Sequence, residues 1–265
     1  MMSPADPLLS IVIPAFNEER RLPRTLEALA AHCRGFECSW EIIAVVEQSS
    51  DRTVEVASAV ASTHPEISVI ANQLQRGKGF ALRTGVGLSS GAIVLTMDAD
   101  LSVPVEFIDT FMAFLDKNQT VDIVVGNRRH PDAIIETPQS FPHKTFGELF
   151  SRLARVVGVS NLPDTQCGFK AMRRAPAIEI YSRQTIDGFA CDVEILLLAE
   201  QMGFEIRDLP VRWTNSLESK VRLFRDNLRM LWDVLRVRRR VARTLAALPY
   251  HAPVREEQSV GQRER

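Results

Sequence analysis

Two aspartates, Asp98 and Asp100, directly follow a short apolar run and have the right chemistry to hold a metal ion. Residues 94–97 predict the end of a buried strand, and residues 101–104 turn the chain away. Two carboxylates one residue apart repel each other unless a cation lies near them or both face water. Their oxygens suit a hard divalent cation, Mg2+ or Mn2+, and leave open coordination positions for a phosphate ligand. A helix N-cap or a solvated turn is the alternative interpretation.

A basic loop at residues 76–79 (Arg-Gly-Lys-Gly) is the second chemical signal. Arg76 and Lys78 supply two cations, and the glycines give a permissive backbone before a helix expected from about Phe80. Such an arrangement favours anions. The loop is not a P-loop, because no serine or threonine follows the lysine. A solvated surface turn is again the alternative. Taken together, the loop and the two aspartates predict a metal–diphosphate site with neutralising cations.

Alternating strands and helices must position these groups. Apolar, β-branched runs predict strands at residues 10–14, 41–46, 67–70, 93–97 and 121–126, and helices are expected from residues 18–19, from a cap at 50–51, and from about 80. Strands that are apolar on both faces are typical of parallel sheets covered by helices. We therefore expect an α/β fold with a mostly parallel sheet. Ligands of such sheets bind beyond the carboxyl ends of the strands, where both chemical signals fall.

The second half of the chain is less regular. We expect a polar loop at residues 130–144, helices at 145–157 and 192–202, a return to the core at 163–172, and a strand at 205–213. From residue 217 the pattern becomes a basic amphipathic helix, in which Val221, Phe224, Leu228, Leu231 and Leu235 recur at helical spacing among arginines. The predicted organisation is one α/β domain over 1–215, this helix over 216–246, and a disordered tail over 247–265.

Composition excludes several classes of protein. The 265 residues are 45% hydrophobic and carry a net charge of -1, which suits one domain and gives no sign of nucleic-acid binding. No apolar run is long enough to span a membrane. The N-terminus lacks the basic start and apolar stretch of a secretory signal. The four cysteines have no C-x-x-C spacing and are expected to be reduced thiols. We expect a cytoplasmic protein.

Several motifs resemble a known family. IVIPAFNEE, RGKGFALRTG and MDADLS resemble the nucleotide-sugar-binding half of inverting family 2 glycosyltransferases, which have the GT-A fold. GNRRH, DTQCGFKAMRR, CDVEILLLAEQMGF and LPVRWTNSLESKV resemble the dolichyl-phosphate glucosyltransferase and polyprenyl-phosphate hexosyltransferase branch. The resemblance covers roughly residues 10–225. It implies a Rossmann-like GT-A sheet flanked by helices and a metal-dependent, inverting transfer of glucose from UDP-glucose to a dolichyl- or undecaprenyl-type phosphate.

Other activities are consistent with the same motifs. GDP-mannose-dependent mannosyl transfer to the lipid phosphate and family 2 transfer to a soluble acceptor are the nearest alternatives. A nucleotide-sugar-binding protein without transferase activity is a third. A sugar-nucleotide pyrophosphorylase is disfavoured, because the first strand is not followed by a glycine-rich loop with a basic residue.

The resemblance also implies roles for individual residues. The nucleotide sugar would be bound by Pro14, Ala15, Glu18, Glu47, Asp51, Arg76, Lys78, Asp98 and Asp100, of which Asp98 and Asp100 would hold Mg2+ or Mn2+. The acceptor phosphate would be bound by Arg128, Arg129, Lys170 and Lys220. The catalytic candidates are Asp192, Gln166 and Arg128. Gln166 would lie near the transferred sugar. Asp192 falls where related transferases place a base or an acid that orients the acceptor, with a helix cap as its alternative.

One segment departs from the family pattern. The usual Asp-Asp-Gly-Ser stretch after the second strand is replaced by Val-Glu-Gln-Ser-Ser-Asp, which has no glycine. Either Glu47 or Asp51 would have to contact the base, so the pattern leaves uracil and guanine open.

An acceptor phosphate and a membrane are linked in this interpretation. A phosphate monoester has a second pKa near 6, so the nucleophile is already ionised at neutral pH and needs no strong base. A polyprenyl acceptor resides in a bilayer, and an arginine-rich amphipathic helix can lie on an anionic surface. We therefore expect peripheral contact with the inner face of the membrane through residues 217–243. Packing of this helix on the domain, or an oligomer contact, is the alternative.

Overall fold

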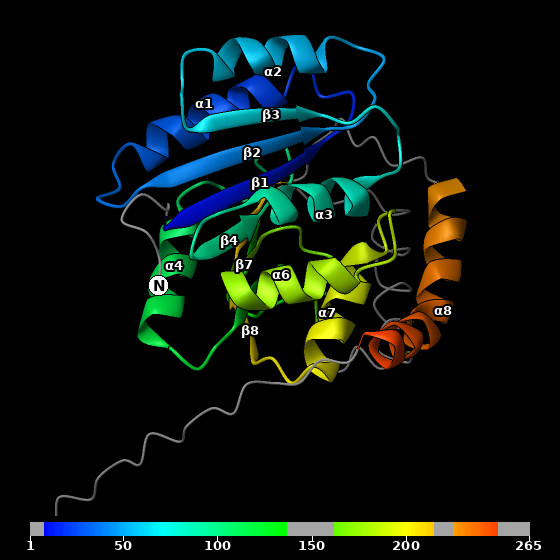
Figure 1. The fold of residues 1–265 in the computed structure, drawn as a ribbon. Helices are drawn as coiled ribbons and strands as arrows, with labels where there is room; N and C mark the ends of the chain where they lie inside the picture. Colours follow the sequence, from blue (N-terminus) through cyan, green and yellow to red (C-terminus); the bar gives the residue numbers. More distant parts are fainter. Residues whose placement is uncertain (1–7, 137–161, 215–224, 249–265) are drawn as a thin grey trace, which may run out of the picture.

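A computed structural model of the chain describes residues 8–136, 162–214 and 225–248. These residues form a seven-stranded sheet of order β3-β2-β1-β4-β7-β5-β8, most of whose strands are labelled in Figure 1. A small second sheet is formed by β6 and β9. The strands of the main sheet are β1 (Leu9–Ala15), β2 (Trp40–Val46), β3 (Ile67–Ala71), β4 (Ile93–Thr96), β5 (Ile123–Asn127), β7 (Lys170–Arg173) and β8 (Ile206–Pro210). The small sheet pairs β6 (Ile134–Ile135) with β9 (Arg212–Trp213) in parallel.

The sheet is mostly parallel, which confirms the predicted α/β class. The pairs β1–β2, β1–β4, β2–β3 and β5–β8 are parallel. Only β7 is antiparallel to its neighbours β4 and β5 in the described sheet. This reversal matters for the site, because it brings the residues just before β7 to the same edge as the residues just after β4.

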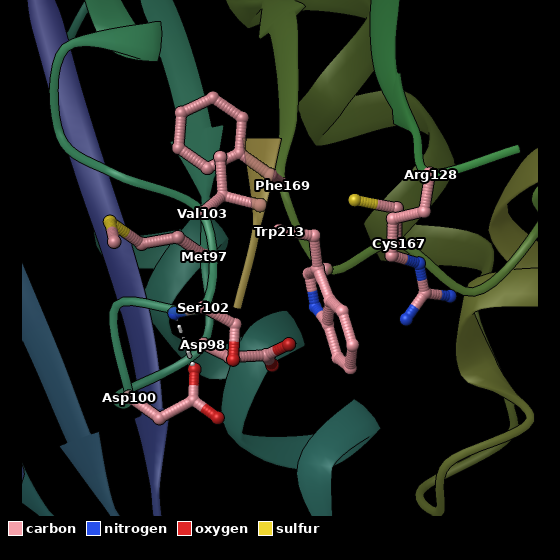
Figure 2. A pocket seen from close by; sticks show the side chains of 10 residues that line it. Met97, Asp98, Asp100, Ser102, Val103, Arg128, Cys167, Phe169 and Trp213 are labelled. Carbon is pink, nitrogen blue, oxygen red and sulfur yellow. Dashed lines mark hydrogen bonds between the residues drawn. The ribbon is translucent and has the colours of Figure 1, made fainter. Parts of the chain in front are cut away.

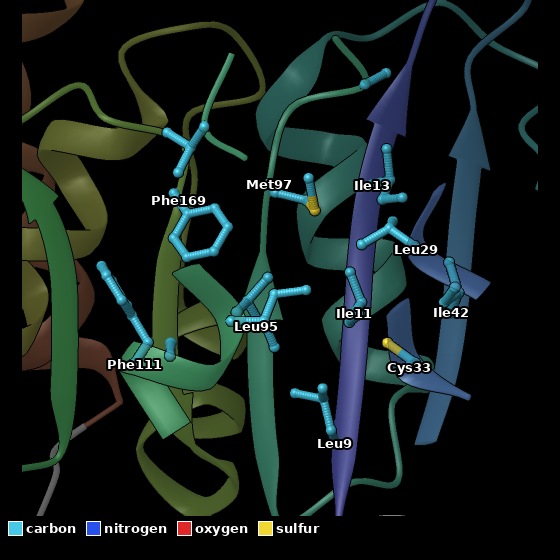
Figure 3. Close-up of a cluster of buried hydrophobic side chains, with 14 of the residues drawn as sticks. Leu9, Ile11, Ile13, Leu29, Cys33, Ile42, Leu95, Met97, Phe111 and Phe169 are labelled. Carbon is cyan, nitrogen blue, oxygen red and sulfur yellow. The ribbon is translucent and has the colours of Figure 1, made fainter. Parts of the chain in front are cut away.

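Helices cover both faces of the sheet. They are α1 (Leu22–Cys33), α2 (Thr53–Ala61), α3 (Lys78–Leu88), α4 (Phe107–Lys117), α6 (Arg174–Arg183), α7 (Cys191–Gln201) and α8 (Arg225–Ala247). Side chains of α1, α2 and α4 share one apolar cluster, and those of α3, α6, α7 and α8 share another. Along β1 the side chains alternate between the two: Leu9, Ile11 and Ile13 join the first cluster (Figure 3), and Val12 joins the second.

Three predicted elements differ from the structure. The predicted strand over 205–213 is two strands, because the chain after Pro210 leaves the main sheet to pair with β6. Helix α1 begins at Leu22 rather than at residues 18–19, because residues 18–21 form a turn that carries site contacts. Helix α3 begins at Lys78 rather than at about Phe80. The helix predicted over 145–157, most of the tail over 247–265 and Lys220 lie outside the described residues.

Helix α8 is packed against the domain through valines. Val234, Val237 and Val241 are fully buried in the cluster that contains α7. Leu235, which belonged to the predicted apolar repeat, is exposed instead, as is Trp232. The buried face of α8 is therefore the one that carries these valines, and not the one that carries Leu235, as the sequence repeat predicted. No described helix combines the length and apolar character that a membrane span requires.

Candidate active site

The two aspartates lie on a tight turn directly after β4. Leu101 has a φ of 53°, a conformation that costs free energy for a bulky residue and must be held by its surroundings. The Asp100 Oδ1 atom accepts a hydrogen bond from the Ser102 amide at 3.0 Å. The Thr25 hydroxyl of α1 donates to the Ala99 carbonyl at 2.8 Å. The first contact fixes the direction of the Asp100 carboxylate, and the second holds the backbone between the two acids. Both acids line one pocket (Figure 2).

Each of the two carboxylates has a cation beside it. The Lys78 ammonium lies 2.8 Å from Asp98 Oδ1, and the Arg21 guanidinium lies 3.9 Å from Asp100 Oδ2. Arg21 also pairs with Glu18. Neither aspartate caps a helix, because the next helix, α4, begins only at Phe107. The protein itself thus offsets the repulsion between the two acids.

The pKa values of the Lys78–Asp98 pair shift toward the charged forms. Burial lowers the pKa of Lys78, but the carboxylates of Asp192 and Asp98 outweigh it and hold that pKa well above its ordinary value. Burial raises the pKa of Asp98, but the charge and hydrogen bond of Lys78 lower it by more, so the pKa lies below its ordinary value. Both groups are therefore ionised at neutral pH.

A pocket opens beside this turn, with the two acids on one wall. It is lined by Met97, Asp98, Asp100, Ser102, Val103, Arg128, Cys167, Gly168, Phe169 and Trp213 (Figure 2). Gly168 is required for the approach of its segment to the turn, because a Cβ there would lie 2.4 Å from Asp98 Oδ2. The predicted DTQCGFK segment therefore meets the predicted acidic pair, as the antiparallel β7 dictates.

Arg128 forms the opposite wall and is held by a buried acid. Its Nε and Nη2 atoms donate to the two Asp164 carboxylate oxygens at 2.6 Å and 2.8 Å. Its guanidinium lies 5.6 Å from the Trp213 ring centroid. Burial raises the pKa of Asp164, but Arg128 outweighs it and brings the pKa to about 2. A guanidinium clamped in this way presents a fixed positive charge to the pocket.

The basic loop is ordered by a buried glutamate. The carboxylate of Glu47 is 2% exposed and accepts hydrogen bonds from the amides of Arg76 and Gly77 and from the Asn72 side chain. The Asp187 carbonyl accepts from the amides of Gly79, at 2.7 Å, and Phe80. Backbone donors that the sequence pattern offered to an anion are thus already bonded inside the protein. The loop's side chains, not these four amides, are what it has to offer a phosphate.

The side chains of the loop point to different neighbours. Arg76 pairs with Asp187 at 2.6 Å and stacks on Phe80, with its guanidinium carbon 4.2 Å from the ring centroid. The Arg76 side chain is 44% exposed, whereas that of Lys78 is 13% exposed. Lys78 is therefore the cation that the fold directs toward the acidic pair, and Arg76 lies at the outer rim.

The predicted nucleoside residues line the ends of β1 and β2. Pro14 and Ala15 close β1. Beyond them the Glu18 amide donates to Thr53 Oγ1 at 2.7 Å, and Asp51 Oδ1 accepts from the Thr53 amide at 3.0 Å. The Glu18–Thr53 bond ties the segment after β1 to the start of α2, whereas the Asp51–Thr53 bond is local to the start of α2. The Asp51 carboxylate is half-buried and is used in this way at the start of α2.

Two predicted residues are buried together behind the pocket. Lys170 is fully buried, and its ammonium lies 2.5 Å from Asp192 Oδ1 and 2.5 Å from the Cys167 carbonyl oxygen. The predicted contact between Lys170 and an acceptor phosphate does not fit this geometry, because the ammonium has no access to the surface. Asp192 is not the helix cap of the alternative interpretation either, since Ala190 holds that position.

Two residues predicted for the acceptor phosphate and the sugar, Arg129 and Gln166, do not line the pocket. Arg129 is exposed on the segment after β5, and Gln166 precedes Cys167 without lining the pocket. Lys220 lies outside the described residues. Arg21 and Asp187 contact predicted site residues but lie outside the quoted motifs, whereas Asp164 and Trp213 lie inside quoted motifs without having been given a role. The position of Arg21 three residues after Glu18 was a usable signal, whereas Asp187 reaches the loop from more than a hundred positions away in sequence.

The two aspartate carboxylates can hold a metal ion only if a further ligand, such as a phosphate, completes its coordination. Among the described residues no three His, Cys, Asp or Glu side chains come together to hold an ion. Asp98 and Asp100 supply hard oxygen ligands, and their side chains are 44% and 20% exposed at the pocket. Two carboxylates with room beside them fit Mg2+ or Mn2+ when phosphate oxygens complete the coordination.

Comparisons with known proteins give the family. The family model described as "Glycosyl transferase family 2" matches residues 10–181. The dolichyl-phosphate beta-glucosyltransferase of Homo sapiens is 30% identical over 243 residues, which cover 88% of this chain and 75% of that protein. A dolichyl-phosphate beta-glucosyltransferase of Trichomonas vaginalis is 31% identical over 245 residues, covering 89% of this chain and 75% of that protein.

Solved structures confirm the fold. Mannosyl-3-phosphoglycerate synthase from Rubrobacter xylanophilus superposes with a TM-score of 0.66 at 20% identity, covering 91% of this chain and 75% of that chain. Glucosyl-3-phosphoglycerate synthase from Mycobacterium tuberculosis, in complex with Mn2+, UDP-glucose and phosphoglyceric acid, gives 0.65 at 19% identity, covering 89% and 80%. The predicted GT-A fold is confirmed. The chain belongs to glycosyl transferase family 2, and it is a hexosyltransferase of that family.

Proposed function

We propose that this protein transfers glucose from UDP-glucose to a polyprenyl phosphate, with a divalent metal ion and with inversion at the anomeric carbon. The observation that carries the proposal is the pocket in which an acidic pair faces a clamped arginine. It has support from the relatives named dolichyl-phosphate beta-glucosyltransferase. We assign the donor diphosphate to the side of Asp98 and Asp100 and the acceptor phosphate to the side of Arg128.

Charge on the donor side supports this assignment. A nucleoside diphosphate brings negative charge to two carboxylates, which is unfavourable without a cation between them. Bound Mg2+ or Mn2+ would be held by Asp98 and Asp100 and would stabilise the charge of the leaving diphosphate. Lys78, at 2.8 Å from Asp98, is the protein's own cation at this point. Arg76 at the rim is assigned to the outer phosphate or to the nucleoside end.

Chemistry on the acceptor side requires orientation rather than proton removal. A phosphate monoester is ionised at neutral pH, so one of its oxygens can attack the anomeric carbon directly. The new bond forms from carbon to the acceptor oxygen while the bond to the donor phosphate oxygen breaks, and the nucleoside diphosphate leaves with that electron pair. Arg128 would bind the acceptor phosphate and hold it opposite the leaving group, which produces inversion. Trp213, beside Arg128, offers an apolar face to the sugar.

Helix α8 supports a peripheral membrane contact. Its inner valines pack against the domain, while Trp232 and Leu235 are 53% and 55% exposed. The exposed side also carries Arg236, Arg239 and Arg243. Exposed large apolar side chains among arginines suit the interface of an anionic bilayer, where a polyprenyl phosphate resides. We propose that this side of α8 faces the inner leaflet and brings the pocket to its acceptor.

A donor and acceptor panel tests the proposal. UDP-glucose, UDP-galactose and GDP-mannose are each incubated with a short polyprenyl phosphate or with a soluble phosphorylated acceptor, with Mg2+ or Mn2+. We expect lipid-linked sugar with UDP-glucose and with neither of the other two donors, and no product when a chelator is added. The transfer rate of Asp100→Ala should be lower by at least about 100-fold. Transfer from GDP-mannose would replace the donor assignment. Transfer to the soluble acceptor alone would replace the acceptor assignment, and full activity with the chelator would refute the metal.

A further inference from the structure

A chain of four alternating charges runs from the interior to the acidic pair. The Lys170 ammonium lies 2.5 Å from Asp192 Oδ1, Asp192 Oδ2 lies 3.3 Å from the Lys78 ammonium, and Lys78 lies 2.8 Å from Asp98 Oδ1. Exposure rises along the chain, from 0% for the Lys170 side chain to 5%, 13% and 44% for those of Asp192, Lys78 and Asp98. The four groups come from β7, α7, α3 and the turn after β4.

The fold is built to let this chain form. The N-terminal ends of helices α3 and α7 approach closely at Gly79, where a Cβ would lie 2.7 Å from the Cys191 Cβ and 2.2 Å from the Ile186 carbonyl oxygen. Glycine alone permits this approach, and it brings Lys78 to Asp192. A buried charged pair is costly to desolvate, so its presence calls for an explanation beyond stability.

Both Asp192 oxygens are already engaged by lysines. A general base must present a free oxygen to the proton that it removes. The Asp192 carboxylate is 5% exposed, with Oδ1 on Lys170 and Oδ2 on Lys78. Asp192 therefore directs the Lys78 ammonium toward the acidic pair and does not present its own carboxylate there.

We infer that Asp192 is a positioning residue and not the base of the transfer reaction. Its carboxylate lies between the two lysines and holds the Lys78 ammonium at the place where the donor diphosphate binds. The inference rests on the proposed function, because Lys78 matters in this way only if a diphosphate binds at the acidic pair. Lys170 has a matching part: its fully buried ammonium, 2.5 Å from Asp192 Oδ1, holds the Asp192 carboxylate in one direction. Both residues act on the donor through Lys78.

The test is a double-mutant cycle on nucleotide binding. The affinity of UDP with Mn2+, and of GDP with Mn2+, is measured by titration calorimetry for the wild type, Asp192→Asn, Lys78→Met and the double variant, and kcat is measured with UDP-glucose. Lys78→Met should weaken binding by about 10- to 100-fold, the worth of one charge-assisted contact. Asp192→Asn should weaken it by about tenfold. The double variant should bind the nucleotide with an affinity within about twofold of that of Lys78→Met, because both substitutions remove the same contact.

A catalytic base gives a different pattern. Asp192→Asn would then leave nucleotide affinity unchanged and lower kcat by about 100- to 10,000-fold, in the Lys78→Met background as well. That result would overturn this inference and leave the proposed function standing. Failure of the wild type to bind either nucleotide would overturn the proposed function, and this inference with it. Asp116→Asn, on the exposed side of α4, is the matched control and should behave as the wild type.

Folding is controlled by a second variant. Asp192→Asn leaves the Lys170 charge buried without its partner, which destabilises the protein. Asp192→Leu combined with Lys170→Met replaces the pair by apolar side chains of similar size and should fold. This variant should show the same loss of nucleotide affinity as Asp192→Asn. Wild-type affinity in a folded Asp192→Leu/Lys170→Met protein would contradict the positioning role.

Discussion

A methyl group at Gly168 should impair the donor site without removing any of its chemical groups. A Cβ built there would lie 2.4 Å from Asp98 Oδ2 and 2.8 Å from its carboxyl carbon, whereas ordinary contact begins at 3.4 Å. The Asp98 carboxylate must therefore move by about 1 Å, and a displacement of this size in a reacting constellation costs about 100-fold in rate. The same movement pulls Asp98 from Lys78. Since the side chain that moves is only half-buried, the fold should survive.

The assay compares Gly168→Ala with Gly87→Ala. Gly87 is exposed on α3, and a Cβ there meets nothing within 4 Å, so its alanine variant should keep full activity and gain up to about 1 kcal/mol of stability. For Gly168→Ala we expect kcat/KM with UDP-glucose to fall by about 100-fold with a melting temperature near that of the wild type. A kcat/KM within about threefold of the wild type would refute the role given to the Asp98 carboxylate.

Further predictions concern the loop, the buried acid and α8. Removing the carboxylate in Glu47→Ala leaves two loop amides unbonded, so KM for UDP-glucose should rise about tenfold; an unchanged KM and unchanged proteolysis of the loop would contradict this. The pKa of Asp164 is depressed from 3.8 to about 2 in the folded protein, so the stability it contributes is present above pH 3.8 and is lost as the pH falls toward 2. At 1.36 kcal/mol per pKa unit this amounts to about 2 kcal/mol. Between pH 3.8 and 2, the free energy of unfolding measured in urea should therefore fall by about 2 kcal/mol more for the wild type than for Asp164→Asn. An equal fall in both proteins would argue against this contribution. Arg236→Glu with Arg239→Glu should abolish co-sedimentation with vesicles containing phosphatidylserine, while leaving transfer to a detergent-dispersed acceptor intact; equal sedimentation would refute the α8 contact.

The fold class and the position of the acidic pair follow from local patterns in the sequence. Continuous apolar runs predict parallel strands, and such strands place their following residues on one edge. The pair Asp98 and Asp100 and the loop around Lys78 therefore meet as expected. Local periodicity also predicts α7 at residues 192–202, within one residue of its observed bounds.

The partners of these groups could not be predicted in the same way. Glu47 and Asp187 reach the basic loop over large sequence separations, and only the tertiary fold reveals that its amides are already bonded. The burial of Lys170 likewise depends on β7 lying antiparallel inside the sheet, which no local pattern indicates. On α8, Leu235 continues a helical repeat but faces outward, because helical spacing alone does not tell which stripe meets the domain.

Anomalous diffraction from a crystal grown with Mn2+ and UDP-glucose would show directly whether the acidic pair holds a metal ion beside the donor diphosphate. We expect a manganese peak within coordinating distance of the Asp98 and Asp100 carboxylates, with the donor diphosphate between that ion and Lys78. A nucleotide sugar bound in the pocket with no manganese at the acidic pair, and with its diphosphate away from Lys78, would contradict it.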